Sequence, residues 1–475
     1  MRRPAKTLRG ELEYTPIMHK NILNRFLSQA WQYAAAAILG FFLVPFMLGV
    51  VLTFSSISEI MIHRQPAKIT DNATSAPVKQ EGQLETLILL GNNGTEVTDL
   101  MASSEILSAS GKFHVFTAAP VKTLSPTTGA VSILPDYSLK DAPPAQVIVI
   151  PPVLGSMSPE TLDHLKKRAE SAKQVLCLGE GARLCASLGI LDGKEATTHF
   201  IAQDDLVKSF SAVRWVTGKR AWVDGNIITS SGMTASMDAA LLAVEKAGGP
   251  QASKQVRESL RLPRIPLSDQ PSDVSKSDIF LLFLHGGFDW DKKSIDVLLY
   301  PDVSEIGLAA ALDTFPRTFS IHTNTVSPER KLIRTQHGLQ LVATQALDPD
   351  QRPDLLIVPS GPSGESSSRS SPLQEEAVRR WIAGTNVMAK SYFYDPPGTA
   401  FDQSLQMIST LEGSRIAAFC AKMVELPSLR FPENHAEDLL RKHFWMISLL
   451  GMALASIILS LWQTRTKTVS ARKRR

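Results

Sequence analysis

The stretch QVLCLGEGARLCASLGILDGKEATTHF, residues 174–200, decides the fold of this chain. It opens with a short apolar run, residues 174–178, which predicts a buried strand. The turn Gly179-Glu180-Gly181 follows, and residues 182–188 have the pattern of a short helix closed by Gly189. A strand, a tight turn and a helix in this order predict a nucleophile elbow, a turn that lifts one side chain above the sheet edge at the N-terminus of a helix.

The motif G-A-x-x-x-A-x-x-G-[IL]-L-D-G-x-x-A-T-T-H-[FW] within this stretch resembles the DJ-1/PfpI family of the class I glutamine-amidotransferase-like superfamily. It is most similar to the branch that also occurs as the sensor half of AraC-type regulators. The elbow of that branch has the sequence C-T-G-A, and its Cys is the nucleophile. Aligned on Gly189, the chain has Gly179 at the position of this Cys and Glu180 at the position of Thr, while Gly181 and Ala182 match. The resemblance therefore implies a family site that lacks its nucleophile.

The resemblance also implies which other residues belong to the site. Related enzymes use a thiolate, an acidic residue of the first loop and often a histidine. Asp99 matches the Asp-Leu at the start of the first helix, with Glu96 as the other available carboxylate, and His199 matches the Thr-His of the family. Asp99 could instead be a carboxylate that stabilises a helix start, and His199 a structural histidine.

Cys177 is the alternative nucleophile, because it lies two residues before Gly179 and would face the same side of the sheet. The other interpretation of Cys177 is a buried, inert cysteine. Glu180 could occupy the pocket where the anion of a substrate would lie. The predicted catalytic residues are therefore no more than Cys177, His199 and Asp99, and the predicted binding residues are Gly179, Glu180, Gly181, His199 and Asp99.

Strands and helices alternate along residues 84–250, which predicts a parallel sheet with helices on both faces. The pattern starts again at residues 295–300, IDVLLY, and resembles the opening half of the family through residues 353–359. Phe401-Asp402-Gln403-Ser404-Leu405 then resembles Met237-Asp238-Ala239-Ala240-Leu241 directly after the next strand, so the second copy has no elbow. We expect an α/β chain with two flavodoxin-like, doubly wound parallel-sheet domains, the second truncated, between two transmembrane helices.

Two uncharged segments, residues 30–54 and 444–462, are long enough to span a bilayer, which takes roughly 20 apolar residues. The whole chain carries a net charge of +4. The tail before the first segment carries +4 and the tail after the second carries +6, so the part between them is at −6. The positive-inside rule then predicts a two-pass protein of the inner membrane, with both termini in the cytoplasm and the large middle part in the periplasm of a bacterium.

These boundaries divide the chain into eight parts. They are a cytoplasmic basic tail (1–29), a transmembrane helix (30–54), a tether (55–83), a DJ-1/PfpI-like domain (84–250), a connector with one strand-like piece at 279–284 (251–293), a second, truncated DJ-1/PfpI-like domain (294–427), a transmembrane helix (444–462) and a basic tail (463–475).

Composition and residue spacing argue against several kinds of site. Three cysteines do not describe a disulfide framework, and no cysteine or histidine pair has metal-ligand spacing, so we expect neither a metal nor a cofactor. The acidic middle part argues against nucleic-acid binding. His285-Gly286-Gly287 resembles an oxyanion motif only superficially and lies in the connector.

The sequence thus favours a membrane-anchored pseudoenzyme that binds a small molecule or a partner protein, either as a homo-oligomer or with its two domains paired within the chain. One alternative is a cysteine-dependent hydrolase or hydratase that uses Cys177. The other is a regulatory sensor related to AraC-type regulators, although no helix-turn-helix follows the second apolar segment.

Overall fold

The computed structural model describes residues 16–61, 79–268, 274–290, 292–359, 372–391, 399–426, 430–431 and 438–472. The chain forms two compact units. One consists of residues 1–52 and 439–475, and the other of residues 53–438. Most of the predicted tether, residues 62–78, lies outside the described residues, while its first part continues the first helix to Met61.

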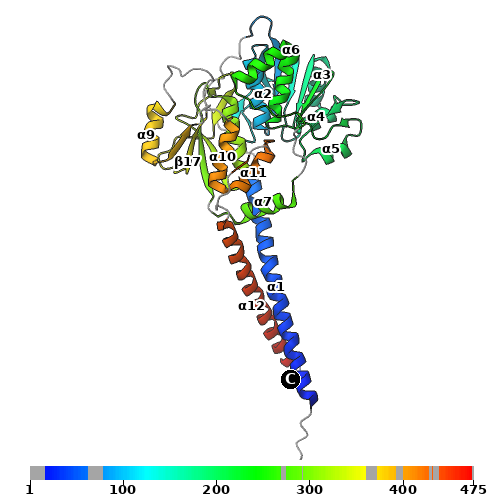
Figure 1. Cartoon of the computed structure of the whole chain (residues 1–475), viewed down its shortest axis with the longest axis vertical. Coiled ribbons are helices and arrows are strands. Elements are labelled where there is room, and N and C mark those ends of the chain that lie inside the picture. Colours follow the sequence, from blue (N-terminus) through cyan, green and yellow to red (C-terminus); the bar gives the residue numbers. More distant parts are fainter. Residues whose placement is uncertain are drawn as a thin grey trace, which may run out of the picture. The chain divides into compact units, whose positions relative to one another are not determined.

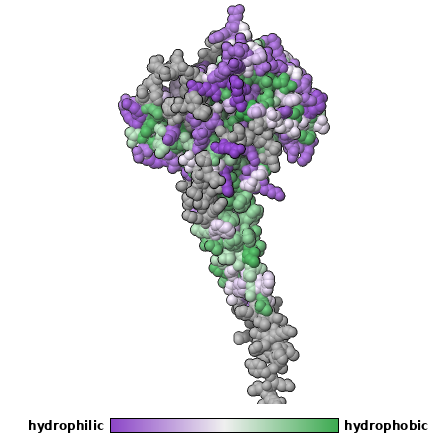
Figure 2. Space-filling model, viewed as in Figure 1, coloured by the Kyte–Doolittle hydropathy of each residue, from purple (hydrophilic) through white to green (hydrophobic). Residues whose placement is uncertain are grey.

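The first unit is a pair of helices, α1 (Pro16–Met61) and α12 (Asp438–Arg472) (Figure 1). Each contains a segment long and apolar enough to cross a membrane, Leu27–Ser55 and His443–Arg465. Only 17% of the most apolar window of each segment is buried, whereas a core helix of a soluble protein would be mostly covered. The apolar side chains instead face outward along both helices (Figure 2).

Small residues bring the two helices together. A Cβ atom on Gly40 would lie 2.3 Å from the carbonyl oxygen of Gly451, and one on Gly451 would lie 2.4 Å from that of Gly40. Further along, Tyr33 donates a hydrogen bond to the Gln463 side chain (3.1 Å), which in turn donates to Gln32 (3.0 Å). Close backbone contact at glycine and interhelical hydrogen bonds are how helices associate in lipid, where no hydrophobic effect drives them together.

The second unit begins with a seven-stranded sheet in the order β10-β11-β7-β6-β1-β2-β5. All neighbours pair in parallel except β10 and β11. The strands are β1 (Leu84–Leu89), β2 (Phe113–Ala119), β5 (Tyr137–Ser138), β6 (Val147–Ile150), β7 (Gln174–Leu178), β10 (Ala221–Asp224) and β11 (Ile227–Ser230). Two short strands, β8 (Glu195–Ala196) and β9 (Arg214–Trp215), pair separately.

Helices cover both faces of this sheet, as the alternating pattern predicted. Along β1, Leu87 and Leu89 belong to one apolar cluster, and Ile88 belongs to the other, because successive side chains of a strand point to opposite faces. The helices α2 (Val97–Ala109) and α6 (Ala235–Ser259) contribute to the cluster of Ile88, and α3 (Pro159–Ser171) and α4 (Gly181–Ser187) to that of Leu87. A further short helix is α5 (Gln203–Ser209).

A second, five-stranded parallel sheet has the order β16-β13-β12-β17-β18. Its strands are β12 (Lys293–Leu298), β13 (Ile321–Ser327), β16 (Gln345–Ala346), β17 (Leu355–Val358) and β18 (Met388–Ser391). Its helices are α8 (Glu305–Thr314), α9 (Glu376–Thr385), α10 (Ala400–Glu412) and α11 (Ser414–Met423), with a 3-10 turn at Phe315–Thr318. The order of neighbours matches β5-β2-β1-β6-β7 of the first sheet, and α10 begins at Ala400, soon after β18 ends at Ser391.

The two sheets are joined by a third one, in the order β14-β15-β4-β3. The strands β3 (Ser125–Pro126) and β4 (Val131–Leu134) come from the first half, and β14 (Ile333–Arg334) and β15 (Gln340–Ala343) from the second. Beside this sheet α2 packs on α8, where Thr98 donates to Asp313 (2.8 Å) and Ser304 donates to Glu105 (2.9 Å). The two halves therefore share one apolar core.

The prediction of a strand at 279–284 is wrong, because this piece lies inside α7 (Lys276–Phe288). Ser275 and Asp278 form a capping box, in which each side chain accepts a hydrogen bond from the backbone of the other. Such a cap stabilises the first turn of a helix. The connector is also shorter than expected, since α6 continues to Ser259 beyond a kink at Gly249.

Candidate functional site

The elbow between β7 and α4 has the predicted backbone, and its turn is tightly enclosed. Gly179 has a φ of +50°, in the left-handed region that favours glycine. Its N–H donates to the carbonyl of Ser230 (3.0 Å), and its carbonyl accepts from the hydroxyl of Thr198 (3.0 Å). A Cβ on Gly181 would lie 2.1 Å from the carbonyl oxygen of Ile150, so this position also accepts only glycine.

The space above Gly179 is filled by the protein itself. A Cβ atom at this position would lie 2.9 Å from Oδ2 of Asp99, 3.2 Å from Cα of Gly232 and 3.4 Å from Cγ of Pro152. The first distance is shorter than real side-chain contacts, and the first two neighbours are a buried carboxylate and backbone. A cysteine in the place where the family carries its nucleophile would therefore have to displace the carboxyl group of Asp99 and push back the backbone of Gly232.

The two thiols nearest the elbow are joined to each other. Cys177 on β7 and Cys185 on α4 form a disulfide, and both residues are fully buried. The sequence did not indicate this bond, and the interpretation of Cys177 as a free thiolate does not hold for this state of the protein. Cys420, the remaining cysteine, is a buried free thiol whose pKa is raised far above its usual value by burial.

Asp99 is the predicted residue that the structure does bring to the elbow. It is fully buried, and Oδ1 accepts a hydrogen bond from Ser236, while Oδ2, which faces Gly179, has no hydrogen-bond partner. Burial raises the pKa of Asp99 to about 7, and the hydrogen bond from Ser236 opposes the shift. A carboxyl group in this setting keeps its proton at higher pH than an exposed one.

Glu96, rather than Asp99, is the helix cap. Its side chain accepts a hydrogen bond from the N–H of Asp99 (2.6 Å). This bond gives a partner to one of the backbone N–H groups that the first turn of a helix leaves free. The pKa of Glu96 is raised well above its usual value by burial, with further contributions from the charges of Asp313 and Asp99. Asp99 lies in the first turn of α2, where a carboxylate stabilises a helix start, but the capping hydrogen bond itself comes from Glu96.

His199 is buried and uncharged. Burial, and then the charge of Arg317, lower its pKa to about 4. Its Nδ1 accepts a long hydrogen bond from the N–H of Ile201 (3.4 Å), its Nε2 has no hydrogen-bond partner, and its ring lies beside that of Phe200. Glu180, in contrast, is exposed and makes no side-chain cap, and its role in an anion pocket stays a prediction.

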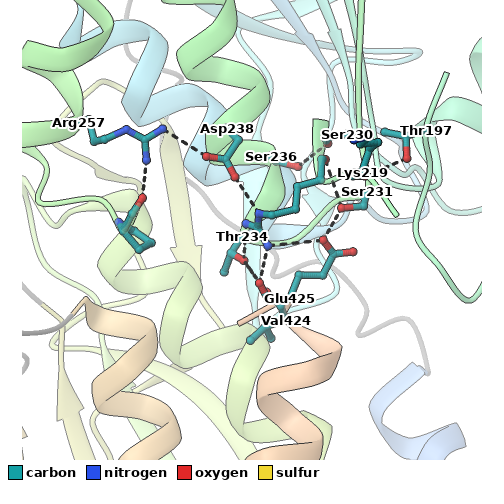
Figure 3. A network of polar contacts seen from close by, with 12 residues as sticks. Thr197, Lys219, Ser230, Ser231, Thr234, Ser236, Asp238, Arg257, Val424 and Glu425 are labelled. Carbon is teal, nitrogen blue, oxygen red and sulfur yellow. Dashed lines mark hydrogen bonds and ion pairs between the residues drawn. The ribbon is translucent and has the colours of Figure 1, made fainter. Parts of the chain in front are cut away.

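The loop that follows β11, which lies against the elbow, is covered by a segment that comes much later in the chain, as 190 residues separate Thr234 from Val424 (Figure 3). Val424 and Glu425, directly after α11, contact the loop that follows β11. Thr234 donates to the carbonyl of Val424 (2.6 Å), and Ser231 donates to the carboxylate of Glu425. Burial raises the pKa of Glu425 to about 8, while the charge of Arg220 opposes the shift.

Arg220 holds this contact together. Its fully buried guanidinium donates to Asp238 (2.9 Å), to Thr234 (3.2 Å) and to the carbonyl of Glu425 (2.5 Å) (Figure 3). Arg257 binds the other oxygen of Asp238 (3.3 Å). The sequence interpretation missed Arg220 and Glu425. The available signal was a basic residue directly before the apolar pair Ala221-Trp222, but its partner Glu425 is 205 residues away.

Comparison with known proteins places these residues in a family. The model of the DJ-1/PfpI family matches residues 85–246. The chain is 30% identical over 157 residues to isonitrile hydratase of Pseudomonas putida, covering 68% of that protein and 32% of this chain. It is 35% identical over 112 residues to the HTH-type transcriptional regulator CdhR of Pseudomonas aeruginosa, covering 33% of that protein and 24% of this chain.

Among solved structures, the chain is similar to Drosophila melanogaster DJ-1beta, with 22% sequence identity and a TM-score of 0.34. The match covers the whole of that protein and 38% of this chain. A THiJ/PfpI family protein from Pseudomonas syringae matches over 43% of this chain and 84% of its own length, with 21% identity and a TM-score of 0.35.

Proposed function

Because the chain belongs to the DJ-1/PfpI family, in the branch related to the sensor halves of AraC-type regulators, we propose that it is a membrane-anchored, non-catalytic member of this family. In this proposal it binds a partner protein or a small molecule outside the cytoplasm. The fold alone does not decide between an enzyme and a binding protein, since function resides in the site.

The observation that carries this proposal is the occupied space above Gly179. A covalent mechanism needs a nucleophile at the crest of the turn. Here the crest is a glycine whose missing side chain is replaced by the carboxyl group of Asp99 and the backbone of Gly232. The nearest thiol, that of Cys177, is bonded to Cys185. No described residue near the turn combines the position and the free thiol that the family reaction uses.

The membrane location is supported by three observations of different kinds. The chain has two segments of spanning length, Leu27–Ser55 and His443–Arg465, whose apolar side chains are exposed. Basic tails flank both segments, whereas the part between them is acidic. The disulfide between Cys177 and Cys185 belongs to the part between them, and disulfides persist in oxidising compartments such as the periplasm.

The second half supports a scaffold role rather than a second activity. Its strand order repeats that of the first half, and it contributes β14 and β15 to the shared sheet. In this proposal the chain is a tandem in which the truncated second domain replaces a dimer partner. Its last segment, with Val424 and Glu425, then closes the loop beside the degenerate elbow.

Topology can be tested with a reporter that is active only in the periplasm, inserted after Ser268. This position is exposed and lies in a loop beyond α6. The same reporter fused after Arg475 is the matched control. We expect activity for the insertion after Ser268 and none for the terminal fusion, and the opposite pattern would reverse the proposed orientation.

The alternative, a cysteine-dependent hydratase, is favoured by the relative named isonitrile hydratase and by the presence of Cys177 at the elbow strand. The purified full chain should be assayed with an isonitrile, with and without a reductant that opens the disulfide. We expect no turnover in either condition. Turnover that appears on reduction and disappears in Cys177→Ser would overturn the non-catalytic proposal.

A further inference from the structure

A second polar cluster lies away from the elbow, in the half of the unit that the family model does not match. It consists of His285, Asp289 and Glu412, each of which offers one ligand atom, and these atoms all lie within 4.8 Å of one another. His285 and Asp289 are four residues apart on α7 and its C-cap, so they lie on one face of the helix. Glu412 is the last residue of α10.

His285 makes this cluster unusual. It is 1% exposed, and neither of its ring nitrogens has a hydrogen-bond partner. Its Nδ1 lies 3.8 Å from a carboxylate oxygen of Asp289 and 3.8 Å from one of Glu412. An imidazole nitrogen without a hydrogen-bond partner can offer its lone pair to a metal. Buried polar groups without a partner are rare in folded proteins.

The surroundings favour a cation. Two carboxylates face each other here, and two helices, α7 and α10, end at the cluster. The C-terminal end of a helix carries partial negative charge, which stabilises positive charge nearby. Lys293, 3.0 Å from Oε1 of Glu412, supplies one positive charge against these negative groups.

Another cluster of one histidine and two carboxylates, Glu105, Glu305 and His337, has its hydrogen bonds satisfied within the protein. Both Glu305 oxygens accept hydrogen bonds, from the hydroxyl of Thr335 (2.6 Å), from the N–H of His337 (2.9 Å) and from its ring (2.9 Å). Glu105 accepts from Ser304 and from the N–H of Ile306 (2.7 Å). These groups satisfy one another, so this cluster serves as an internal control.

We propose that His285, Asp289 and Glu412 bind one divalent metal ion of the zinc class, which links the C-terminal ends of α7 and α10. One imidazole and two carboxylates are ligands that Zn²⁺ accepts, with water in the remaining position. Ser320, which donates to Oε2 of Glu412 (3.0 Å), would orient that carboxylate. The ion would fasten the connector helix to the second half, apart from the elbow.

The test uses the full chain, purified in detergent without a histidine tag and stripped with a chelator. Zn²⁺ is titrated by calorimetry, and Co²⁺ by its absorption spectrum, which reports the ligand geometry. We expect one site per chain. His285→Ala should weaken Zn²⁺ binding by at least ~10-fold, because removing even a residue that only hydrogen-bonds to a metal ligand typically weakens binding that much. His337→Ala, in the control cluster, should leave binding unchanged.

Glu412→Gln is the second variant, because it keeps the shape of the side chain if His285→Ala fails to fold. Zn²⁺ should raise the melting temperature of the wild type and of His337→Ala but not that of Glu412→Gln. Equal Zn²⁺ binding by the wild type, His285→Ala and Glu412→Gln, or no binding by the wild type, would overturn the proposal.

Discussion

Gly179 and Gly232 touch through their backbones. A Cβ atom on Gly232 would lie 2.8 Å from Cα of Gly179, and one on Gly179 would lie 3.2 Å from Cα of Gly232. Both residues have positive φ, +50° and +100°. The loop that follows β11 therefore lies directly on the turn that follows β7. A nucleophile could return to position 179 only if this loop moved away.

Gly179→Ala should destabilise the protein more than the same substitution at another glycine with positive φ, where the added Cβ would contact nothing. Gly193 is the matched control, since its φ is +70° and a Cβ there would meet nothing within 4 Å. We expect Gly193→Ala to cost about 1 kcal/mol and Gly179→Ala a further ~1–3 kcal/mol. Chemical unfolding of the purified chain measures both, and equal losses would show that the space above Gly179 is open.

Thiol counting tests the disulfide between Cys177 and Cys185. In denaturant without reductant, iodoacetamide should label only Cys420, and after reduction it should label all three cysteines. Mass spectrometry of the tryptic peptides gives the count. Three labelled thiols before reduction would mean that the bond does not form, and the thiol-enzyme alternative would regain its nucleophile.

Arg220→Met should be strongly destabilising. The change leaves the buried carboxylates of Asp238 and Glu425 without their shared cation, and breaking a buried ion pair costs about 3–5 kcal/mol. Arg183→Met removes a surface pair with Asp205 and should cost less than about 1 kcal/mol. Thermal unfolding of the two variants compares the losses, and similar small values would show that Arg220 does not hold the closing segment.

Asp99 should make stability depend on pH. Its pKa is about 7 in the folded chain against an ordinary value of 3.8, so the folded state holds a proton that the unfolded state releases. Its contribution is present below pH ~4 and is lost as the pH rises towards ~7. Asp99→Asn cannot titrate, so the difference in stability between the wild type and this variant should shift in favour of the variant over that interval. A constant difference from pH 4 to 8 would contradict the raised pKa.

Gly451→Leu should separate α1 and α12. A Cβ at this position lies 2.4 Å from the carbonyl oxygen of Gly40, so a larger side chain forces the backbones apart. Cysteines replacing Gln32 and Gln463, whose side chains are hydrogen-bonded, should cross-link in membranes of the parent but not of the variant. Ala453→Leu, on an exposed part of α12, should retain the cross-link.

Some features of the site follow from short-range sequence patterns. The apolar run 174–178 and the glycines beside it predicted β7, the turn and α4, because strand and turn preferences act over a few residues. Ser158 likewise caps the start of α3 through a hydrogen bond from the N–H of Thr161, three residues away. The piece 279–284 was misassigned, since its apolar run fits a strand or a helix and only the capping box at Ser275 decides between them.

Residues close together in the chain were enough to predict the family, the order of strands and helices in the first sheet and the missing side chain at position 179, because each of these depends on local patterns. Three contacts became evident only in the folded chain: the disulfide of Cys177 with Cys185, the ion pair of Glu425 with Arg220, and the approach of His285 to Glu412. The last two pairs are brought together when distant segments pack in one core, and no local pattern records which distant partner a buried charge or imidazole will meet.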